Sequence, residues 1–227
     1  MPEQTPRTLN HFALYAFKDA YWSLDSEGRA AFHKEWLMGL RSAAQSVEIY
    51  QAVEDNADLL VWCTLSSENT HDAASFFEKL VLANAPFHHL IQPGISLWGF
   101  TRPSQYTKTR SAQEIDPFEI TRKQYLVIYP FTKTVEWYLM SREVRQGMMN
   151  EHIRIGKQYE EIKQLLLYSF GLQDQEFVVV YETDDLSRFS DLVNELRSSE
   201  ARRYTLRDTP LHTAVYHPAE ETLALWK

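Results

Sequence analysis

The sequence contains little cysteine, little glycine and no long apolar run. Cys63 is the single cysteine among 227 residues, so no internal disulfide or cysteine-rich metal site is possible, and we expect a buried, inert thiol. Seven glycines, with no G-x-G-x-x-G or P-loop pattern, give no support for the usual kinds of nucleotide binding. No apolar run approaches the roughly 18–20 residues of a membrane span, and the N-terminus lacks the order of a signal peptide. We therefore expect a soluble, cytoplasmic protein.

Basic residues are scarce relative to acidic ones. The 23 Lys and Arg against 31 Asp and Glu give a formal net charge of −8, and no basic stripe is visible. Proteins that bind nucleic acid more often carry such a stripe to meet the phosphates, so no nucleic-acid partner is expected. What the chain does have is 44% hydrophobic and 13% aromatic residues, enough to form the core of one large domain or two small ones.

The two halves of the sequence resemble each other. Residues 12–36 open with a strand-like run, pass a Trp and enter a helix through Ser26, and residues 126–152 repeat this order with Ser141 as the expected N-cap. Each half then offers two strands joined by a polar turn, a helical pattern and a final strand. The two strands are expected within residues 47–65 of the first half and 165–183 of the second. The helix is expected over 72–83 and 186–199, and the final strand over 94–100 and 211–217.

The order strand, helix, strand, strand, helix, strand therefore occurs twice. It predicts an α+β fold of tandem ferredoxin-like (split βαβ) repeats with antiparallel sheets. We expect an N-terminal domain over residues 1–104, a linker over 105–122 and a C-terminal domain over 123–227.

His152 is an unexpected residue in the second half. It aligns along a predicted helix with an apolar face formed by Val144, Met148, Ile155 and Tyr159. The aligned residue in the first half is Trp36, so the scaffold does not need a histidine at this place. Two interpretations stay open at this point: a core histidine bonded to a carbonyl, or a ligand for iron held in a flat apolar cofactor.

Four segments of the second half form a distinctive series: "YPFTKTVEWY", "MMNEHIRIG", "YSFGLQDQEFVVVYETDD" and "EARRYTLRDTP". Together they resemble the chlorite dismutase-like haem proteins, a family that includes the coproheme decarboxylases. The resemblance extends from about residue 11 to the C-terminus. It implies the doubled ferredoxin-like fold, a haem pocket in the C-terminal half, and assembly into a homo-oligomeric ring, commonly a pentamer.

The resemblance also assigns residues to the iron and the porphyrin. It makes His152 the proximal iron ligand, and a neutral imidazole on a helix suits that chemistry. Glu200 stands where the family has an acidic residue that accepts the second imidazole N–H. Trp137 and Tyr138 match an aromatic pair that packs along the porphyrin in relatives.

The distal side distinguishes the possible functions. Chlorite dismutases carry an arginine above the iron, and counting back from the "YSFG" motif puts Gln164 there, with Lys163 as the alternative. Glutamine offers no fixed cation for an anionic oxychlorine substrate, although it can hydrogen-bond a peroxide or a water. Chlorite dismutation is therefore disfavoured.

Tyr129 and Lys133 in "YPFTK" match the coproheme decarboxylases. The resemblance implies that the tyrosine is oxidised and takes a hydrogen from a propionate, while the lysine holds that carboxylate. Tyr15 occupies the equivalent place in the first half, so a structural tyrosine is also acceptable to the fold. Lys133 has no such counterpart and is the more informative residue.

Further propionate contacts are expected from Thr209 and Tyr106, which match hydroxyl contacts in relatives. The usual propionate-binding arginine is missing, because the spacing puts Ile115 at its position, and Arg110 or Arg122 could substitute. The leading hypothesis is peroxide-dependent oxidative decarboxylation of coproheme to haem b, with an iron porphyrin and hydrogen peroxide as the partners. The alternatives are a haem peroxidase, a haem carrier or sensor, and, more remotely, a ferredoxin-like module without haem.

Overall fold

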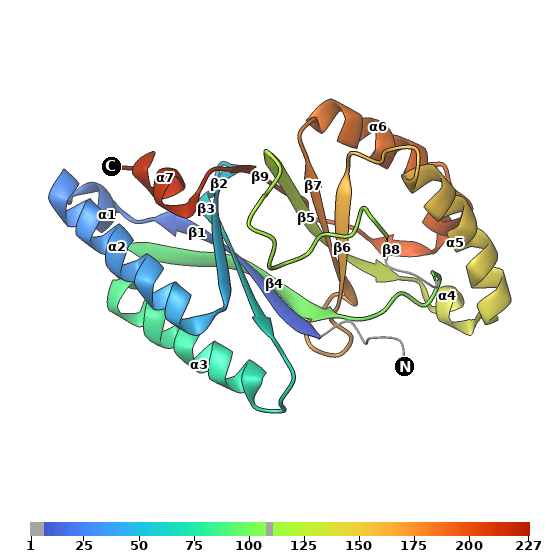
Figure 1. Cartoon of the computed structure of the whole chain (residues 1–227), viewed down its shortest axis with the longest axis horizontal. Coiled ribbons are helices and arrows are strands. Elements are labelled where there is room, and N and C mark those ends of the chain that lie inside the picture. The colour runs from blue at the N-terminus through green and yellow to red at the C-terminus, as the bar shows by residue number, and fades with distance from the viewer. Residues whose placement is uncertain (1–6, 108–110) are drawn as a thin grey trace.

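The structure is a computed structural model that describes residues 7–107 and 111–227 (Figure 1). It confirms the α+β fold and the doubled order of elements. The first half comprises β1 (Thr8–Phe17), α1 (Asp19–Trp22), α2 (Ser26–Ala43), β2 (Ser46–Glu54), β3 (Ala57–Ser66), α3 (Asp72–Asn84), the 3-10 turn η1 (Ala85–Phe87) and β4 (Ile91–Thr101). The second half comprises β5 (Tyr125–Lys133), α4 (Val135–Leu139), α5 (Arg142–Gly156), β6 (Lys163–Tyr168), β7 (Phe177–Thr183), α6 (Leu186–Arg197), the 3-10 turn η2 (Glu200–Tyr204), β8 (Thr205–Arg207), β9 (His212–Tyr216) and α7 (Ala219–Ala224).

Helices α2 and α5 begin at side-chain caps. Ser141 caps α5 by accepting a hydrogen bond from the backbone N–H of Val144, as its sequence position predicts. Ser26 is wrong as a cap, because the preceding residue, Asp25, accepts the bond from Gly28 N at 2.8 Å and Ser26 is already helical. A carboxylate is the stronger acceptor at this positive helix end, which accounts for the shift by one residue.

The strands of the two halves join into one sheet. Within the described residues the order is β7-β6-β4-β1-β3-β2-β9-β5-β8, and β7 also pairs with β5, so the eight strands other than β8 form a closed antiparallel ring. Two pairings connect the halves: β4 with β6, through Phe100 and Tyr168, and β2 with β9, through Tyr50 and Tyr216. The ring leaves helices on its outside, at opposite ends of the molecule (Figure 1).

Alternate side chains of each strand fill the interior of the ring. Phe12, Trp62, Leu126, Leu167 and Val180 belong to this shared core, to which both halves contribute. No helix of the described residues is long and apolar enough to cross a membrane.

The helix layer of the first half is packed solid. Trp36 of α2 is fully buried, its ring lies 5.2 Å from that of Tyr15 in an edge contact, and its indole N–H donates to Asn84. Cys63 lies in the same cluster, is buried and free, and burial raises the pKa of its thiol to about 12. The expected burial of the thiol is thereby confirmed.

The helix layer of the second half is not packed in this way. Ile155, Tyr159 and Phe189 join the sheet in a small cluster at one end of the layer. The residues that align with Tyr15 and Trp36, namely Tyr129 and His152, instead line a cavity. The same architecture thus encloses a filled core in one copy and a hollow in the other.

Candidate active site

The cavity lies between α5 and the strands β5, β6 and β7, and its volume is about 970 Å³. Because strand side chains alternate between faces, Tyr129, Phe131 and Lys133 of β5 face the cavity while Leu126 and Ile128 point into the closed ring. Phe177, Val179 and Tyr181 of β7 form the neighbouring part of the wall. The volume lies at the upper end of the range for small-molecule sites, so the ligand it suits is large.

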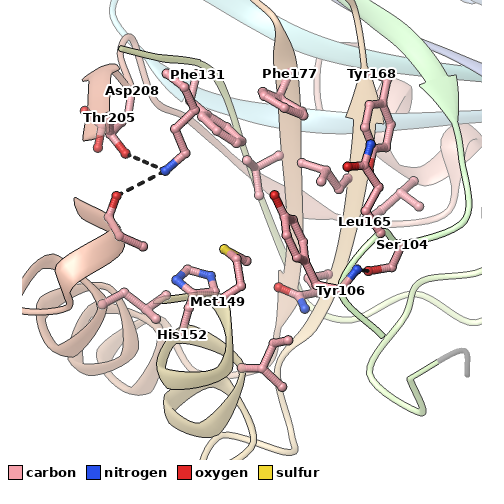
Figure 2. A pocket seen from close by; sticks show the side chains of 18 of the residues that line it. Ser104, Tyr106, Phe131, Met149, His152, Leu165, Tyr168, Phe177, Thr205 and Asp208 are labelled. Carbon is pink, nitrogen blue, oxygen red and sulfur yellow. Dashed lines mark hydrogen bonds between the residues drawn. The ribbon is translucent and has the colours of Figure 1, made fainter. Parts of the chain in front are cut away.

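Helix α5 supplies the opposite wall. Figure 2 shows His152 and Met149 rising from this helix toward Phe131 and Phe177. Arg145 completes the same face, seven residues before His152. The expected face was wrong in part, because Val144 is exposed and Ile155 and Tyr159 are buried in the cluster beside the cavity. The apolar residues Ile155 and Tyr159, at and just after the C-terminal end of α5, thus face the packed cluster, and the residues that line the cavity lie on the neighbouring face of the helix.

The imidazole of His152 is neutral in this setting. Burial, and then the charge of Lys133, lowers its pKa to about 4, against a smaller opposite effect of Glu151. Within the described part of the chain the ring makes no hydrogen bond. A neutral ring with free nitrogens can coordinate a metal without first losing a proton.

Lys133 is a half-buried cation at one side of the cavity. Its ammonium donates to the carbonyl of Ala201 and to Oγ1 of Thr205, both at 3.2 Å, and lies 4.5 Å from the centre of the Trp137 ring. Burial, and then the charge of Arg202, lowers the pKa of Lys133 to about 8. An ammonium carries three N–H donors, so one remains for a ligand.

Tyr129 is a protonated phenol in the same wall. Its ring is stacked on that of Tyr181, with centroids 6.1 Å apart and planes 25° apart. Burial raises the pKa of Tyr129 well above its ordinary value, and a hydrogen bond with Tyr181 and the charge of Asp208 act in the same direction. The hydroxyl therefore keeps its hydrogen at any physiological pH.

Gln164, and not Lys163, lines the cavity. The two residues are adjacent on β6 and so face opposite sides of the sheet. Lys163 is bound to Glu119, with Nζ and Oε2 3.0 Å apart. This placement follows the alignment anchored on the "YSFG" motif.

Three further predicted residues also line the cavity: Trp137, Tyr138 and Tyr106. Tyr138 donates to Glu176 at 2.5 Å, and burial followed by this bond raises the pKa of the phenol far above its usual range. Trp137 is buried, whereas its first-half counterpart Trp22 is 46% exposed, so the scaffold alone does not account for the burial of Trp137.

The structure does not bring Glu200 or Thr209 to the cavity. Glu200 opens η2 and is exposed, with its carboxylate 3.4 Å from Arg203 rather than on His152. Thr209 is exposed outside the cavity wall. Thr205 of the same motif does reach the cavity, together with Ala201, Arg202 and Asp208, and it accepts the bond from Lys133. The motif holds both threonines, and only the backbone path of η2 and β8 decides which one faces inward.

Of the two proposed substitutes for the missing arginine, the one that the structure describes, Arg122, does not line the cavity. Arg122 is buried elsewhere, with its guanidinium 3.4 Å from Glu182 and 4.5 Å from the centre of the Trp62 ring. Arg110 lies outside the described residues, and Ile115 is fully buried in the core of the ring. Sequence reasoning missed other arginines in the cavity wall, among them Arg145 and Arg202.

The residues present fit a large, flat, apolar ligand that carries a metal at its centre and carboxylates at its edge. Aromatic rings of Phe131, Phe177 and Trp137 provide apolar walls, and His152 offers a free neutral nitrogen across the cavity from the strands. Lys133 offers an N–H donor for an anion. These are the components that a haem site requires.

Comparison with known proteins agrees with this chemistry. The family profile described as chlorite dismutase matches residues 24–217. The coproheme decarboxylase of Mycolicibacterium smegmatis is 27% identical over 169 residues, which cover 74% of this chain and 71% of the relative. The coproheme decarboxylase of Staphylococcus saprophyticus is 30% identical over 162 residues, covering 66% of this chain and 65% of the relative.

Solved structures show the same fold. A mutant chlorite dismutase from Candidatus Nitrospira defluvii superimposes with a TM-score of 0.81 at 24% identity, covering 96% of this chain and 95% of that one. A complex of chlorite dismutase from the same organism with imidazole gives a TM-score of 0.80 at 21% identity, covering 96% and 94%. At these identities the likeness concerns the fold alone.

Proposed function

The chain belongs to the chlorite dismutase family, and we propose that it catalyses the peroxide-dependent oxidative decarboxylation of coproheme to haem b. The observation that carries the proposal is the placement of Tyr129 and Lys133 on one strand face, opposite His152 across a cavity of about 970 Å³. A redox-active phenol, a carboxylate-binding cation and an iron ligand thus line one site. Similarity to two coproheme decarboxylases supports the assignment.

His152 would hold the iron, and the aromatic walls would cover the porphyrin. The bound iron porphyrin supplies the redox chemistry, with hydrogen peroxide as the oxidant. Met149 and Ile153 flank His152 on the helix side and exclude water from the face they cover. The imidazole stays unprotonated at neutral pH, because its pKa is about 4.

Tyr129 would move the hydrogen. A propionate that becomes a vinyl group releases carbon dioxide, one proton and two electrons, and the electrons reduce one peroxide to water. Tyr129 would give up its phenolic hydrogen atom and regain one from the propionate chain, which accounts for one of the two electrons. The bound porphyrin would supply the oxidising chemistry for this exchange and for the second electron. The raised pKa of Tyr129 supports this role, because the phenol remains a hydrogen-atom donor and not a phenolate.

Lys133 would hold the reacting carboxylate in reach of Tyr129. The two residues are four apart on β5, so their side chains lie on the same face of the strand. Fixing the reactant beside the reactive group lowers the entropic part of the barrier. The remaining N–H of Lys133 supplies the charge-assisted bond.

Gln164 would contact the peroxide or a water from the distal wall. Because a glutamine and not an arginine stands at this position of the wall, the position would offer no fixed cation to an oxychlorine anion. The distal wall therefore favours peroxide over chlorite.

We also propose the organisation of the chain and its assembly. Residues 1–104 form the N-terminal domain, 105–122 the linker and 123–227 the haem-binding domain. The chain acts in the cytoplasm as a homo-oligomeric ring, a pentamer. Light scattering at micromolar concentration tests the assembly, and a monomer would contradict it.

The reaction is tested by mass spectrometry of the bound porphyrin. Iron coproporphyrin III is added to the protein, followed by peroxide, and the mass should fall by two formic-acid equivalents. Oxidation of a small donor with the porphyrin mass unchanged would indicate a peroxidase. Tight binding without either reaction would indicate a carrier or sensor.

A further inference from the structure

Tyr181 is a second phenol in the cavity wall that the proposed chemistry does not use. It lies on β7, it is buried, and its ring is stacked on that of Tyr129 with the centroids 6.1 Å apart. The Tyr181 ring also contacts Phe189 of α6, with the centroids 5.1 Å apart. Tyr129 is only half-buried, so Tyr181 is the better shielded of the two phenols.

The first half of the chain has a counterpart of Tyr129 but none of Tyr181. In the pairing of β5 with β7, Tyr181 lies opposite the residue two before Tyr129. In the pairing of β1 with β3, the residue at the same place relative to Tyr15 is Val61. The fold therefore accepts a valine here, and a phenol at this position is a feature of the half that contains the cavity.

Tyr181 is not placed to act on a carboxylate held by Lys133. Its partner on β5 is Val127, two residues further from Lys133 than Tyr129 is, which corresponds to about 7 Å along the strand. Tyr129 thus precedes Tyr181 on the path from that carboxylate. Any part that Tyr181 takes in the reaction must pass through Tyr129.

The two hydroxyl groups interact as protonated phenols. Burial raises the pKa of both, so each keeps its hydrogen at physiological pH. The hydrogen bond between them raises the pKa of Tyr129 and lowers that of Tyr181, which is the pattern expected when Tyr129 donates and Tyr181 accepts. A phenol that accepts a hydrogen bond still carries its own O–H group.

We propose that Tyr181 forms a redox pair with Tyr129 and holds the unpaired electron when no propionate is within reach of Tyr129. After Tyr129 has given up its hydrogen atom, the Tyr181 hydroxyl passes one hydrogen atom, a proton and an electron, to the Tyr129 oxygen. Tyr129 becomes a phenol again and Tyr181 a phenoxyl radical, and the reverse transfer restores the radical at Tyr129. One phenolic O–H bond breaks and one forms, so the exchange consumes no oxidant.

The pair would protect the site between turnovers. A radical on the half-buried ring of Tyr129 faces solvent and the ligand, whereas Tyr181 is only 4% exposed. The inference rests on the proposed function, because hydrogen peroxide and the bound porphyrin must first oxidise Tyr129.

The test follows the radical in the haem b complex by freeze-quench electron paramagnetic resonance after addition of hydrogen peroxide. Haem b no longer has the two propionates that react, so Tyr129 finds no hydrogen to regain and the radical persists. The variants are Tyr181→Phe and Tyr129→Phe. Tyr159→Phe is the matched control, because Tyr159 is buried in the same cluster as Tyr181 but lies outside the cavity wall.

The parent and Tyr159→Phe should show two tyrosyl hyperfine patterns, one from each phenol of the pair. Tyr181→Phe should lose one pattern, and the remaining signal should decay faster because its radical stays on the less shielded ring. Tyr129→Phe should lose both patterns, since the radical reaches Tyr181 only through Tyr129.

A second measurement tests the contact without any porphyrin. Urea unfolding of the ligand-free parent, the two single variants and the double variant forms a double-mutant cycle. The two hydroxyls should be coupled by about twofold to tenfold in the unfolding equilibrium constant, as expected for one hydrogen bond between neutral groups.

The pair is overturned if Tyr181→Phe keeps the pattern and decay of the parent, or if the cycle shows no coupling. A parent without any tyrosyl radical overturns both the pair and the role of Tyr129 in the proposed function. A parent that shows both patterns but leaves coproheme unchanged retains the pair and refutes only the reaction.

Discussion

Replacing Lys133 with methionine should stabilise the ligand-free protein while weakening its binding of a carboxylate-bearing porphyrin. Burial, and then the charge of Arg202, lowers the pKa of the ammonium from 10.5 to about 8. Keeping this group charged in the folded protein at neutral pH therefore lowers the free energy of unfolding by roughly 3 kcal/mol. Methionine removes this cost but leaves two acceptors, Ala201 O and Thr205 Oγ1, without their donor, at roughly 1 kcal/mol each. The net gain in the free energy of unfolding should be about 1 kcal/mol.

The effect should depend on pH in a defined direction. The pKa of Lys133 is lower in the folded than in the unfolded chain, so the folded state binds fewer protons between pH 8 and 10.5. The stability of the parent should therefore rise with pH across this window, relative to the methionine variant. The advantage of the variant should be full below pH 8 and should shrink as the pH approaches 10.5.

Urea unfolding of the ligand-free proteins at pH 7 and pH 9.5, with a porphyrin titration at pH 7, measures both effects. Lys79→Met is the control, because this lysine is exposed on α3 and its replacement should change neither quantity. Porphyrin affinity of Lys133→Met should fall about tenfold or more, since the carboxylate loses its cation. A variant that is less stable than the parent and binds porphyrin equally well would show that Lys133 is a structural residue.

Three further predictions concern the proposed iron ligand His152, the proposed redox-active Tyr129 and the distal residue Gln164. His152→Ala should abolish the high-spin ferrous-histidine signature, and an unchanged Soret band and iron–histidine stretch would mean that another residue ligates the iron. Tyr129→Phe should lower coproheme turnover by orders of magnitude while costing about 1 kcal/mol of stability, because only one hydroxyl bond is lost. Tyr15→Phe is the matched control in the first half, whose core is filled, and it should leave activity intact. If both variants are as active as the parent, Tyr129 has only a structural role. With Gln164 in the distal wall, the protein should release oxygen from chlorite slowly, and turnover like that of a dedicated enzyme would refute that view.

The fold was predictable because each half repeats the same local patterns. Comparison of the halves also identified His152 as a residue that the fold itself does not require, since the buried Trp36 occupies the equivalent position in the first half. The closure of the ring was not predictable in this way. It depends on pairings such as Phe100 with Tyr168, which lie far apart in the sequence and leave no local signal.

The family resemblance supplied the strand-borne residues of the site, and alternation along β5 and β6 accounts for how the structure places them. Tyr129 and Lys133 share a face, and Gln164 and Lys163 must face opposite ways. The segment after α6 offered no such rule. There a short 3-10 turn and a three-residue strand decide that Thr205 faces the cavity and Thr209 does not.

The central claim is that this cavity converts coproheme to haem b, and a peroxide titration of the bound porphyrin tests it most directly. Iron coproporphyrin III in complex with the protein is titrated with hydrogen peroxide, and the products are separated and weighed at each step. The account predicts a mono-decarboxylated porphyrin followed by haem b, with conversion complete near two equivalents of peroxide, because each propionate gives up two electrons. Bleaching of the porphyrin, or consumption of peroxide with all four carboxylates retained, would contradict it.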